Sequence, residues 1–435
     1  MSAQPTQIIV PAAVREYIHQ TNFAGGELSA QFSNKDDDLL VVTKIGTAAH
    51  YRARPRLSRD YRALADVARG EVAGQWLTNV PAGTHVAHWR LMHRPGTAIT
   101  YDGFTAMVPN VRAPRGGALL LITHERDMPE DWRDAGVPEY AGWHLSDEGV
   151  TPLSVAFEPE EVGIGQLDPQ WPVAALQQMH VGVVGVGSIG GVVADALAAY
   201  GVGAMDLIDP DRFLWHNQIR HVLGPEAVGL LKVDALADRI TRAWPDTLVH
   251  PYPVNVVSSA HYMRALFPRY DAVVCAADGI AARRVVSHLA RRAQVPAVLA
   301  CVLDDGAVGE VIRLRPGGRY GCLLCQRAVL MAGGGLDLEA HQEVGYGTGD
   351  PHRPMTAVGP DLWFIGHLAA KIAVGTVLEQ QHGDLAHRLP GEHAVVGLRP
   401  SPDTLHEPFD VTTAMDVRWS ELPPPRDGCP TCDPL

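Results

Sequence analysis

The sequence predicts an α/β protein with a doubly wound, mostly parallel sheet and a smaller α+β domain before it. Two observations predict this fold. Beyond residue 165, short apolar and β-branched runs alternate with helical segments, as they do in consecutive βαβ units. The first of these runs, 181–184, leads into a glycine-rich turn and a helix, which is typical of a nucleotide-binding sheet. Residues 1–160 show neither feature, so we assign them to a domain of their own.

Length and composition exclude several classes of protein. With 435 residues, of which 46% are hydrophobic and 20% charged, the chain is long enough for two globular domains. The formal net charge of -13 argues against nucleic acid or an anionic membrane as the main partner. We see no secretory signal and no uncharged apolar run of about eighteen residues, so we expect no membrane span.

In residues 1–160 we expect strands at 39–42 and 118–122 and a helix at 61–69. The segment GQWLTNVP, which begins at Gly74, resembles the G-x-W-H-S-H-P motif of JAB-type metalloproteases. Leu77 and Asn79 stand where that motif has its two zinc-binding histidines, and neither side chain can replace a histidine there. The resemblance therefore implies an inactive, degenerate JAB-like domain; the alternative is chance similarity.

Three histidines of the same region, His85, His88 and His93, invite a metal interpretation. Helical spacing puts the first two on one side of a helix. No carboxylate or cysteine stands beside them in the sequence, so we expect surface or core histidines rather than a metal site.

A segment rich in Glu, Gly and Pro, 158–172, is the expected linker to the second domain, 165–435. Beyond it, strands and helices alternate, which specifies a sheet whose ligand lies at the carboxyl ends of the strands. The expected order is strand 181–184, helix 191–200, strand 204–208, helix 228–244, strand 249–254, helix 261–266, strand 272–274, helix 281–293 and strand 297–300, with a further helix at 362–378.

The turn after the first strand predicts a nucleotide site. It has the pattern G-x-G-x-x-G, in which Gly185, Gly187 and Gly190 are the glycines. The variable positions are filled by a valine, Ser188 and an isoleucine. Small residues let the backbone approach phosphates, and the N–H groups of the following helix face them. Asp209 ends the next strand about twenty residues later, where an acid accepts hydrogen bonds from ribose hydroxyls.

Further polar residues favour a nucleoside triphosphate over a dinucleotide. Arg220 and Lys232 supply positive charge for phosphates, and Asn217 can hydrogen-bond them. Asp278 follows the strand 272–274 and is placed to hold Mg²⁺ against those phosphates.

Together these residues resemble the ThiF/MoeB/ubiquitin-activating superfamily of adenylating enzymes. Its pattern is G-x-G-x-x-G, then D-x-D, then N-x-x-R-Q, a lysine, and an aspartate at a strand end. The matching positions here are Gly185, Gly187, Gly190, Asp209, Asp211, Asn217, Arg220, Lys232 and Asp278. One position departs from the pattern, because His221 stands where the family has glutamine.

The resemblance implies a Rossmann-like adenylation domain that uses ATP and Mg²⁺ to adenylate the C-terminal carboxylate of a ubiquitin-like or sulfur-carrier protein. It also implies a homodimer or pseudo-dimer that brings an arginine onto the phosphates from the opposite half, and an E2-like conjugating enzyme as a possible second partner. Within this scheme residues 1–160 have another interpretation, a catalytically silent adenylation half.

Four of the six cysteines form two C-x-x-C pairs, Cys322 with Cys325 and Cys429 with Cys432. Two such pairs can close a tetrahedral Cys₄ shell around structural Zn²⁺, and the superfamily has zinc at the matching places. This pattern suits a reducing cytoplasm better than a disulfide framework, so we expect a cytoplasmic protein.

Relatives that form a thioester carry a cysteine in the crossover loop after the first C-x-x-C pair. Here the sequence has no cysteine between Cys325 and Cys429, and alignment places His352 near that position. The glycine-rich stretch 333–349 is expected to guide the incoming tail. If a thioester forms, Cys301 at the end of strand 297–300 is the candidate, although a buried core residue is the simpler interpretation.

Two further functions remain open from the sequence. The missing cysteine favours an adenylating enzyme of peptide natural-product or cofactor biosynthesis. A non-catalytic regulatory subunit of an activating enzyme is the other alternative, although such a subunit has no need of Arg220, Lys232 and Asp278.

Overall fold

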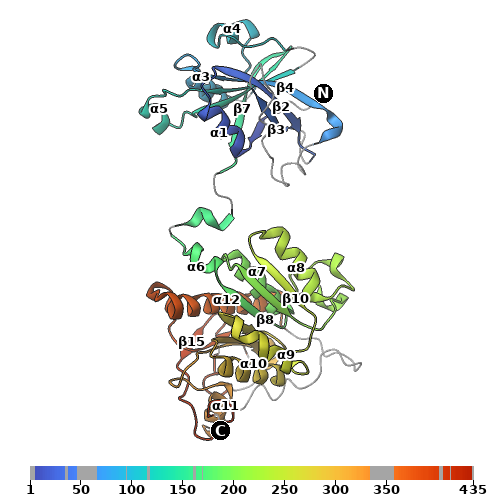
Figure 1. Cartoon of the computed structure of the whole chain (residues 1–435), viewed down its shortest axis with the longest axis vertical. Helices are drawn as coiled ribbons and strands as arrows, with labels where there is room; N and C mark the ends of the chain where they lie inside the picture. Colours follow the sequence, from blue (N-terminus) through green and yellow to red (C-terminus); the bar gives the residue numbers. More distant parts are fainter. Residues whose placement is uncertain are drawn as a thin grey trace. The chain divides into compact units, whose positions relative to one another are not determined.

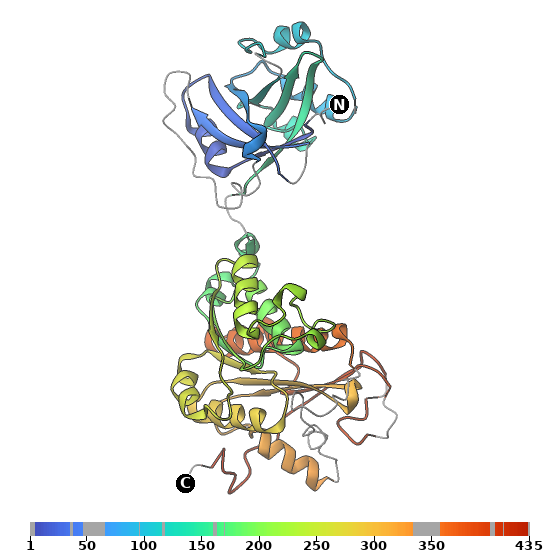
Figure 2. The same ribbon diagram turned by 90° about the vertical axis from the view of Figure 1, so that its right-hand side faces the viewer.

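The computed structural model of the chain describes residues 5–34, 38–46, 66–94, 96–114, 118–159, 163–168, 170–333, 357–400, 405–411 and 413–433. The chain divides into two compact units, Met1–Val162 and Gly163–Leu435, and each is described by itself (Figures 1 and 2).

The first unit is a closed barrel with the strand order β1-β3-β2-β4-β5-β6-β7. The parallel pairing of β1 with both β3 and β7 closes it. Its elements in chain order are β1 (Gln7–Val10), α1 (Ala12–Gln20), β2 (Gly25–Phe32), β3 (Leu39–Gly46), β4 (Glu71–Thr78), α3 (Thr84–Met92), α4 (Tyr101–Met107), β5 (Ala118–His124), α5 (Glu130–Asp134), β6 (Tyr140–Ser146) and β7 (Gly149–Phe157).

The barrel corrects one interpretation of this unit. A silent adenylation half would have a doubly wound parallel sheet, whereas most strand pairs here are antiparallel. The sequence concealed the barrel because strands such as β2 carry Gly, Ser and Gln among few apolar residues. Of the expected helix 61–69, residues up to 65 lie outside the described part, and Val67–Arg69 form a 3₁₀ turn.

The JAB-like segment spans the end of β4 and the turn after it. Leu77 is buried, and Asn79 adopts the left-handed conformation at φ 58°. His85 and His88 are core residues, as expected. The ring nitrogens of His85 contact the Pro138 carbonyl and the Thr123 hydroxyl, each at 2.8 Å.

The second unit contains one sheet of eight strands with the order β10-β9-β8-β11-β12-β13-β14-β15. The first five strands run parallel, and the last three add antiparallel pairs. Its elements are α6 (Val173–Gln177), β8 (His180–Val184), α7 (Ser188–Ala199), β9 (Ala204–Ile208), α8 (Lys232–Ala243), β10 (Leu248–Tyr252), α9 (Ala260–Leu266), β11 (Ala272–Cys275), α10 (Ile280–Ala293), β12 (Ala297–Leu303), β13 (Val308–Leu314), α11 (Leu323–Ala332), α12 (Gly359–His382), β14 (His393–Gly397) and β15 (Val417–Ser420). The predicted doubly wound, mostly parallel sheet is confirmed.

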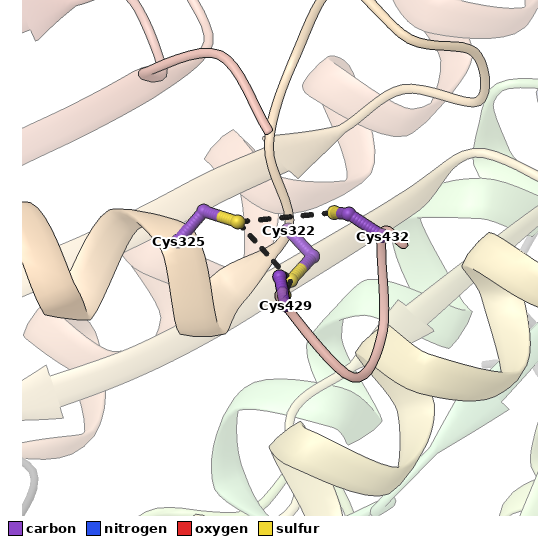
Figure 3. Close-up of side chains that lie close together, drawn as sticks. All are labelled: Cys322, Cys325, Cys429 and Cys432. Atoms are coloured by element: carbon purple, nitrogen blue, oxygen red, sulfur yellow. Dashed lines mark hydrogen bonds between the residues drawn. The ribbon is translucent and has the colours of Figure 1, made fainter. Parts of the chain in front are cut away.

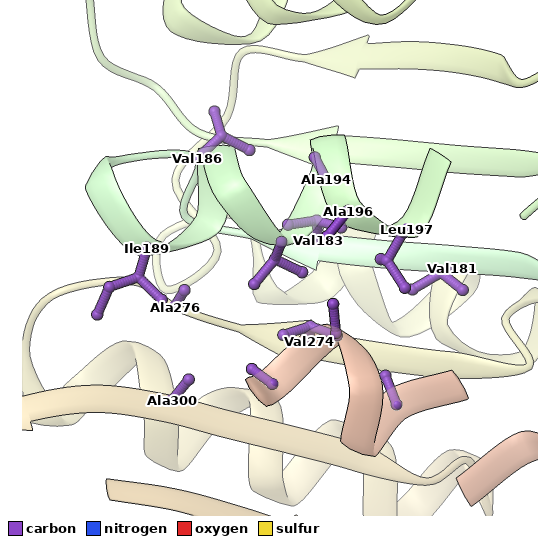
Figure 4. Close-up of a cluster of buried hydrophobic side chains, with 14 of the residues drawn as sticks. Val181, Val183, Val186, Ile189, Ala194, Ala196, Leu197, Val274, Ala276 and Ala300 are labelled. Carbon is purple, nitrogen blue, oxygen red and sulfur yellow. The ribbon is translucent and has the colours of Figure 1, made fainter. Parts of the chain in front are cut away.

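Helices cover both faces of this sheet. Helices α7, α8 and α12 pack on one face, and α9, α10 and α11 pack on the other. Figure 4 shows the first core, where Val181 and Val183 of β8 meet Leu197 of α7 and Val274 of β11. Burying each such side chain stabilises the fold by about 1.5–3 kcal/mol. This packing fixes the strands whose carboxyl ends form the site described next.

Helix α12 is, among the described residues, the one helix whose length and apolar composition would allow a membrane crossing. Most of it is buried, and it packs against α7 and strands β11, β12 and β13. Its apolar character is therefore accounted for by the core of this unit.

Candidate nucleotide-binding site

A cavity of about 390 Å³ opens at the carboxyl ends of β8, β9 and β11. The strand order reverses between β8 and β11, and ligands of doubly wound sheets bind at such a reversal. The predicted site residues that line the cavity are Gly185, Gly187, Asp209, Asp211, Lys232 and Asp278. Their residue types provide a backbone cradle, one cation and three carboxylates.

The glycine turn after β8 has no room for larger residues at two positions. Gly185 has φ +80°, and a Cβ added there would lie 2.4 Å from the Ala277 Cα. A Cβ on Gly190 would lie 1.7 Å from the Gly185 carbonyl oxygen. Gly187, which lines the cavity, is different, because a Cβ there would meet no atom of the described residues within 4 Å. The turn is therefore compact at its base and open toward the cavity.

Asp209 ties this turn to the neighbouring strand. Its Oδ2 accepts the Val186 N–H at 2.8 Å, and its Oδ1 accepts the Asp211 N–H at 2.9 Å. Burial raises the pKa of the Asp209 carboxyl, and the nearby Lys232 ammonium opposes that rise. Asp209 thus holds the turn in place, and lone pairs remain on its oxygens for a ribose hydroxyl.

Lys232 starts α8 and is buried, with its Nζ 2.9 Å from Asp211 Oδ2. Asp278 lines the same cavity from the turn between β11 and α10. The Asp278 residue is exposed; partial desolvation in the cavity raises the pKa of its carboxyl, and the charges of Arg220 and Lys232 oppose that rise. Positive and negative charges therefore meet in one concave site.

Five other predicted residues are not part of the cavity lining: Ser188, Gly190, Asn217, Arg220 and Cys301. Asn217 uses its Oδ1 to accept the Leu214 N–H at 2.8 Å, so one of its polar atoms supports the local turn. The Arg220 carbonyl accepts the Trp363 indole N–H at 2.8 Å. Arg220 thus belongs to a loop that is fixed to α12, and its positive charge favours the ionised form of the Asp278 carboxyl, acting to lower its pKa.

His221, which departs from the family pattern, has a structural role beneath the glycine turn. Its Nδ1 accepts the Leu223 N–H at 3.1 Å, so its Nε2 carries the proton and donates to the Val186 carbonyl at 2.8 Å. Burial lowers the pKa of His221 to about 4, which keeps the ring neutral near pH 7. Val186 is therefore held by Asp209 at its N–H and by His221 at its C=O.

The segment Val254–Val257 lines the cavity and was missed by sequence reasoning. Its three valines, together with Ala276, Ala277, Ala281 and Ala282, form an apolar wall of the cavity, and Asn255 is the one polar residue of the segment. The only signal was its place directly after β10, since apolar residues past a strand end resemble any loop. An apolar wall opposite a polar one suits the flat base of a nucleotide.

Cys301 is a buried residue of β12, as the simpler interpretation expected. Its Sγ accepts a hydrogen bond from Arg283 Nη1 at 2.9 Å. The same arginine contacts Glu310, which also contacts Arg327 and His393. This buried polar network, away from the cavity lining, supports the join between α10, α11 and the sheet.

The four predicted zinc ligands come together although about a hundred residues separate the two pairs. Figure 3 shows their sulfur atoms turned toward one another, two from the start of α11 and two from the C-terminal turn. The Sγ–Sγ distances are 3.6 Å for Cys322–Cys429, 3.9 Å for Cys322–Cys325 and 3.8 Å for Cys325–Cys432. Four sulfurs about 2.3 Å from one tetrahedral ion would lie about 3.8 Å apart, so the donor set fits Zn²⁺.

The crossover loop lies outside the described residues from 334 to 356, and with it His352 and nearly all of the stretch 333–349. The cysteine-free interval between Cys325 and Cys429 remains a fact of the sequence.

The second unit is similar in sequence to known proteins. A sequence model described as the ThiF family matches residues 165–389. The tRNA threonylcarbamoyladenosine dehydratase of Escherichia coli (strain K12) is 30% identical over 165 residues, which cover 37% of this chain and 58% of that protein. Ubiquitin-like modifier-activating enzyme 5 of Culex quinquefasciatus is 28% identical over 167 residues, or 36% and 42% of the two chains. The crystal structure of E. coli MccB with ATP gives a TM-score of 0.44 at 18% identity and covers 60% of this chain and 68% of that one. The chain thus spans about half the length of the curated relatives it matches.

Proposed function

This chain belongs to the ThiF family, and we propose that it uses ATP to adenylate the C-terminal carboxylate of a ubiquitin-like or sulfur-carrier protein. The observation that carries the proposal is the convergence of Lys232, Asp211 and Asp278 on one cavity behind a glycine turn. In the reaction, a carboxylate oxygen attacks the α-phosphorus of ATP. The bond to the bridging oxygen breaks, pyrophosphate leaves, and an acyl-adenylate remains.

The residues in and around the cavity have separate roles in this proposal. The turn 185–190 presents its backbone to the phosphates, and Asp209 orients the ribose. Lys232 and Arg220 neutralise phosphate charge, and Asn217 donates a hydrogen bond. Asp278 would hold Mg²⁺, which would offset further negative charge on the phosphates when bound. The wall at 254–257 would receive the adenine base.

The acyl group is proposed to pass to a thiol of a partner protein, such as an E2-like conjugating enzyme. The sequence has no cysteine in the interval where thioester-forming relatives carry one. Cys301 is buried and bonded to Arg283, which leaves it poorly placed to attack an adenylate. The same absence favours the second candidate, an adenylating enzyme of peptide natural-product or cofactor biosynthesis, where no thioester is required.

Two other functions receive less support. A regulatory subunit would have no need of a buried Lys232 paired to Asp211 at an open cavity. A nucleic-acid substrate, which the name of the E. coli dehydratase suggests for that protein, suits this chain poorly because of its net charge of -13.

A second copy of the chain is the proposed partner at the Arg220 loop. Trp215 and Ile219 are 73% and 84% exposed, which is unusual for large apolar side chains beside a site. Association through them would bring another protomer next to the cavity. Sedimentation of the purified chain and of Ile219→Asp tests this, with dimers expected for the parent alone.

ATP–pyrophosphate exchange tests the activity itself. We expect exchange that depends on a small protein with a C-terminal glycine, and its loss in Asp278→Asn with the fold retained. Asp246→Asn, an exposed acid of the same unit, is the matched control and should exchange like the parent. Exchange supported by short peptides instead would favour the second candidate. ATP binding without exchange, for any carboxylate offered, would contradict both.

A further inference from the structure

A second cluster of metal-ligating side chains lies on the sheet of the second unit, and the proposed function does not use it. It consists of His180 on β8, Asp206 on β9 and His250 on β10. Strands β8 and β9 run side by side with β10 at the edge of the sheet. Asp206 lies on β9 three residues before Asp209, which follows the end of that strand, so the cluster lies roughly 10 Å from Asp209. It is therefore a site separate from the nucleotide cavity.

The parallel register places these side chains on one face. Asp206 pairs with Gly182 of β8 on one side and with His250 of β10 on the other. His180 stands two residues before Gly182, so its side chain points to the same face. His180 Nε2 is 2.8 Å from Asp206 Oδ1, and His250 Nδ1 is 3.1 Å from the same oxygen. One nitrogen of each ring and one oxygen thus converge within 4.8 Å of one another.

Tyr270 fixes the carboxylate in this orientation. Its hydroxyl donates to Asp206 Oδ2 at 2.8 Å, which leaves Oδ1 to face the two imidazoles. Gly182 makes this possible, because a Cβ there would lie 2.8 Å from the Tyr270 ring. The backbone N–H of His180 donates to Asp271 Oδ2 at 2.8 Å, which holds the first ligand as well. A carboxylate oriented from behind by a second hydrogen bond is the usual support of a metal ligand.

We propose that His180, Asp206 and His250 bind a divalent transition-metal ion such as Zn²⁺. Two imidazole nitrogens and one carboxylate oxygen suit zinc and its neighbours, and ligand atoms about 2.0–2.1 Å from a tetrahedral ion lie about 3.4 Å apart. The two distances from an imidazole nitrogen to Asp206 Oδ1, 2.8 and 3.1 Å, are a few tenths of an ångström shorter, so a small outward rotation of the two rings would admit the ion. Three protein ligands leave a fourth position for water or an added ligand.

The three side chains of this site differ in solvent exposure, from the buried carboxylate to the exposed outer imidazole. The Asp206 side chain is 3% exposed, that of His180 is 27% exposed, and that of His250 is 55% exposed. The carboxylate is thus fixed in the fold, whereas an ion can enter past the outer imidazole. Binding would tie three neighbouring strands together, among them the two that lead to the glycine turn and Asp209.

Cobalt binding tests the proposal on the intact chain that retains one equivalent of zinc, held by the Cys₄ site, after a chelator has removed any more weakly bound metal. We expect one equivalent of Co²⁺ to bind beyond the Cys₄ site, with d–d absorption but no thiolate-to-cobalt charge transfer. His250→Ala should lower the affinity at least tenfold, and Tyr270→Phe should lower it about 10–100-fold, since it keeps all three ligands and removes only their support. His261→Ala, an exposed histidine of α9, is the matched control and should bind like the parent.

Two results would overturn the proposal. One is the absence of a binding event beyond the Cys₄ site. The other is unchanged affinity in His250→Ala, which would mean that the three side chains only hydrogen-bond one another. Because His250 is largely exposed, its replacement should leave folding intact, and circular dichroism of the variant checks that. Neither readout depends on adenylation, so failure here leaves the proposed function standing.

Discussion

The Val186 N–H donates to Asp209 Oδ2 across 2.8 Å and so joins the glycine turn after β8 to the end of β9. From the other side, His221 Nε2 donates to the carbonyl of the same residue at 2.8 Å. Both the N–H and the C=O of Val186 are thereby held by hydrogen bonds. A phosphate-binding turn fixed in this way needs little rearrangement when a nucleotide arrives.

Two glycines of this turn should respond differently to the same substitution. Gly190→Ala forces its Cβ against the Gly185 carbonyl, so we expect a loss of about 1–3 kcal/mol in the unfolding free energy of the second unit. In Gly187→Ala the added methyl group meets no atom of the residues that the structure describes, so the variant should keep its stability; because Gly187 lines the cavity, the methyl group should weaken ATP binding at least tenfold. Urea denaturation and calorimetric titration with ATP measure the two effects. Equal stability of the two variants would contradict the geometry of the turn.

Removal of the buried cation should affect the reaction more than the fold. In Lys232→Ala we expect pyrophosphate exchange to fall by at least a hundredfold, because a positive charge close to the phosphates is lost. Lys232→Arg keeps the charge but not the compact ammonium that pairs with Asp211, so it should recover only part of the rate. Arg239→Ala on the same helix is the control. A rate in Lys232→Ala within threefold of the parent would remove Lys232 from the proposed mechanism.

Acid should destabilise the second unit through His221. The folded-state pKa of His221 is about 4, below its unfolded value of 6.5, because burial disfavours the imidazolium. Below pH 6.5 the unfolded chain therefore binds more protons than the folded one. Stability should fall by up to about 1.4 kcal/mol per pH unit as the pH drops from 6.5 toward 4, with no contribution above 6.5.

The variant His221→Gln tests this titration, since glutamine is the residue of the family pattern and does not ionise. Comparison of urea midpoints at pH 7 and pH 5 should show a smaller acid loss than in the parent. His261→Gln should behave like the parent. An identical acid loss in all three proteins would assign the effect to other groups.

The Cys₄ site should hold zinc and tie the C-terminal turn to α11. Cys429→Ser should lose one equivalent of zinc relative to the parent by elemental analysis, because three ligands bind it more weakly than four. Proteolysis should then cut the turn after residue 421 faster. Thr431→Ser changes a neighbour inside the same turn and should keep the metal. Full zinc content in Cys429→Ser would refute the Cys₄ site.

The sheet and the order of its helices were predictable because their signals are local. The run of valines in β8, the glycine turn and the acid after β9 follow one another within about 30 residues, as a βαβ unit requires. The barrel of the first unit was not predictable from the sequence. Its strands alternate polar and apolar residues only weakly, and the barrel is closed by the pairing of β1 with β7, which are far apart in the sequence. The apolar wall at 254–257 also escaped, since nothing in those residues distinguishes a cavity wall from a loop.

By itself the sequence determined the chemistry available to this protein: the glycines, the acids, Lys232 and the two cysteine pairs are chemical identities that no folding can alter. Only the tertiary structure decided which of them meet. It brought Asp278 and Lys232 to one cavity, and it left Asn217 and Cys301 outside the cavity lining. It also placed His180, Asp206 and His250 on one face, although 26 and 44 residues separate Asp206 from its neighbours. The physical reason is the register of the strands. Which residues of neighbouring parallel strands stand side by side sets the distances between their side chains, and the separation of these residues in the sequence does not encode that register.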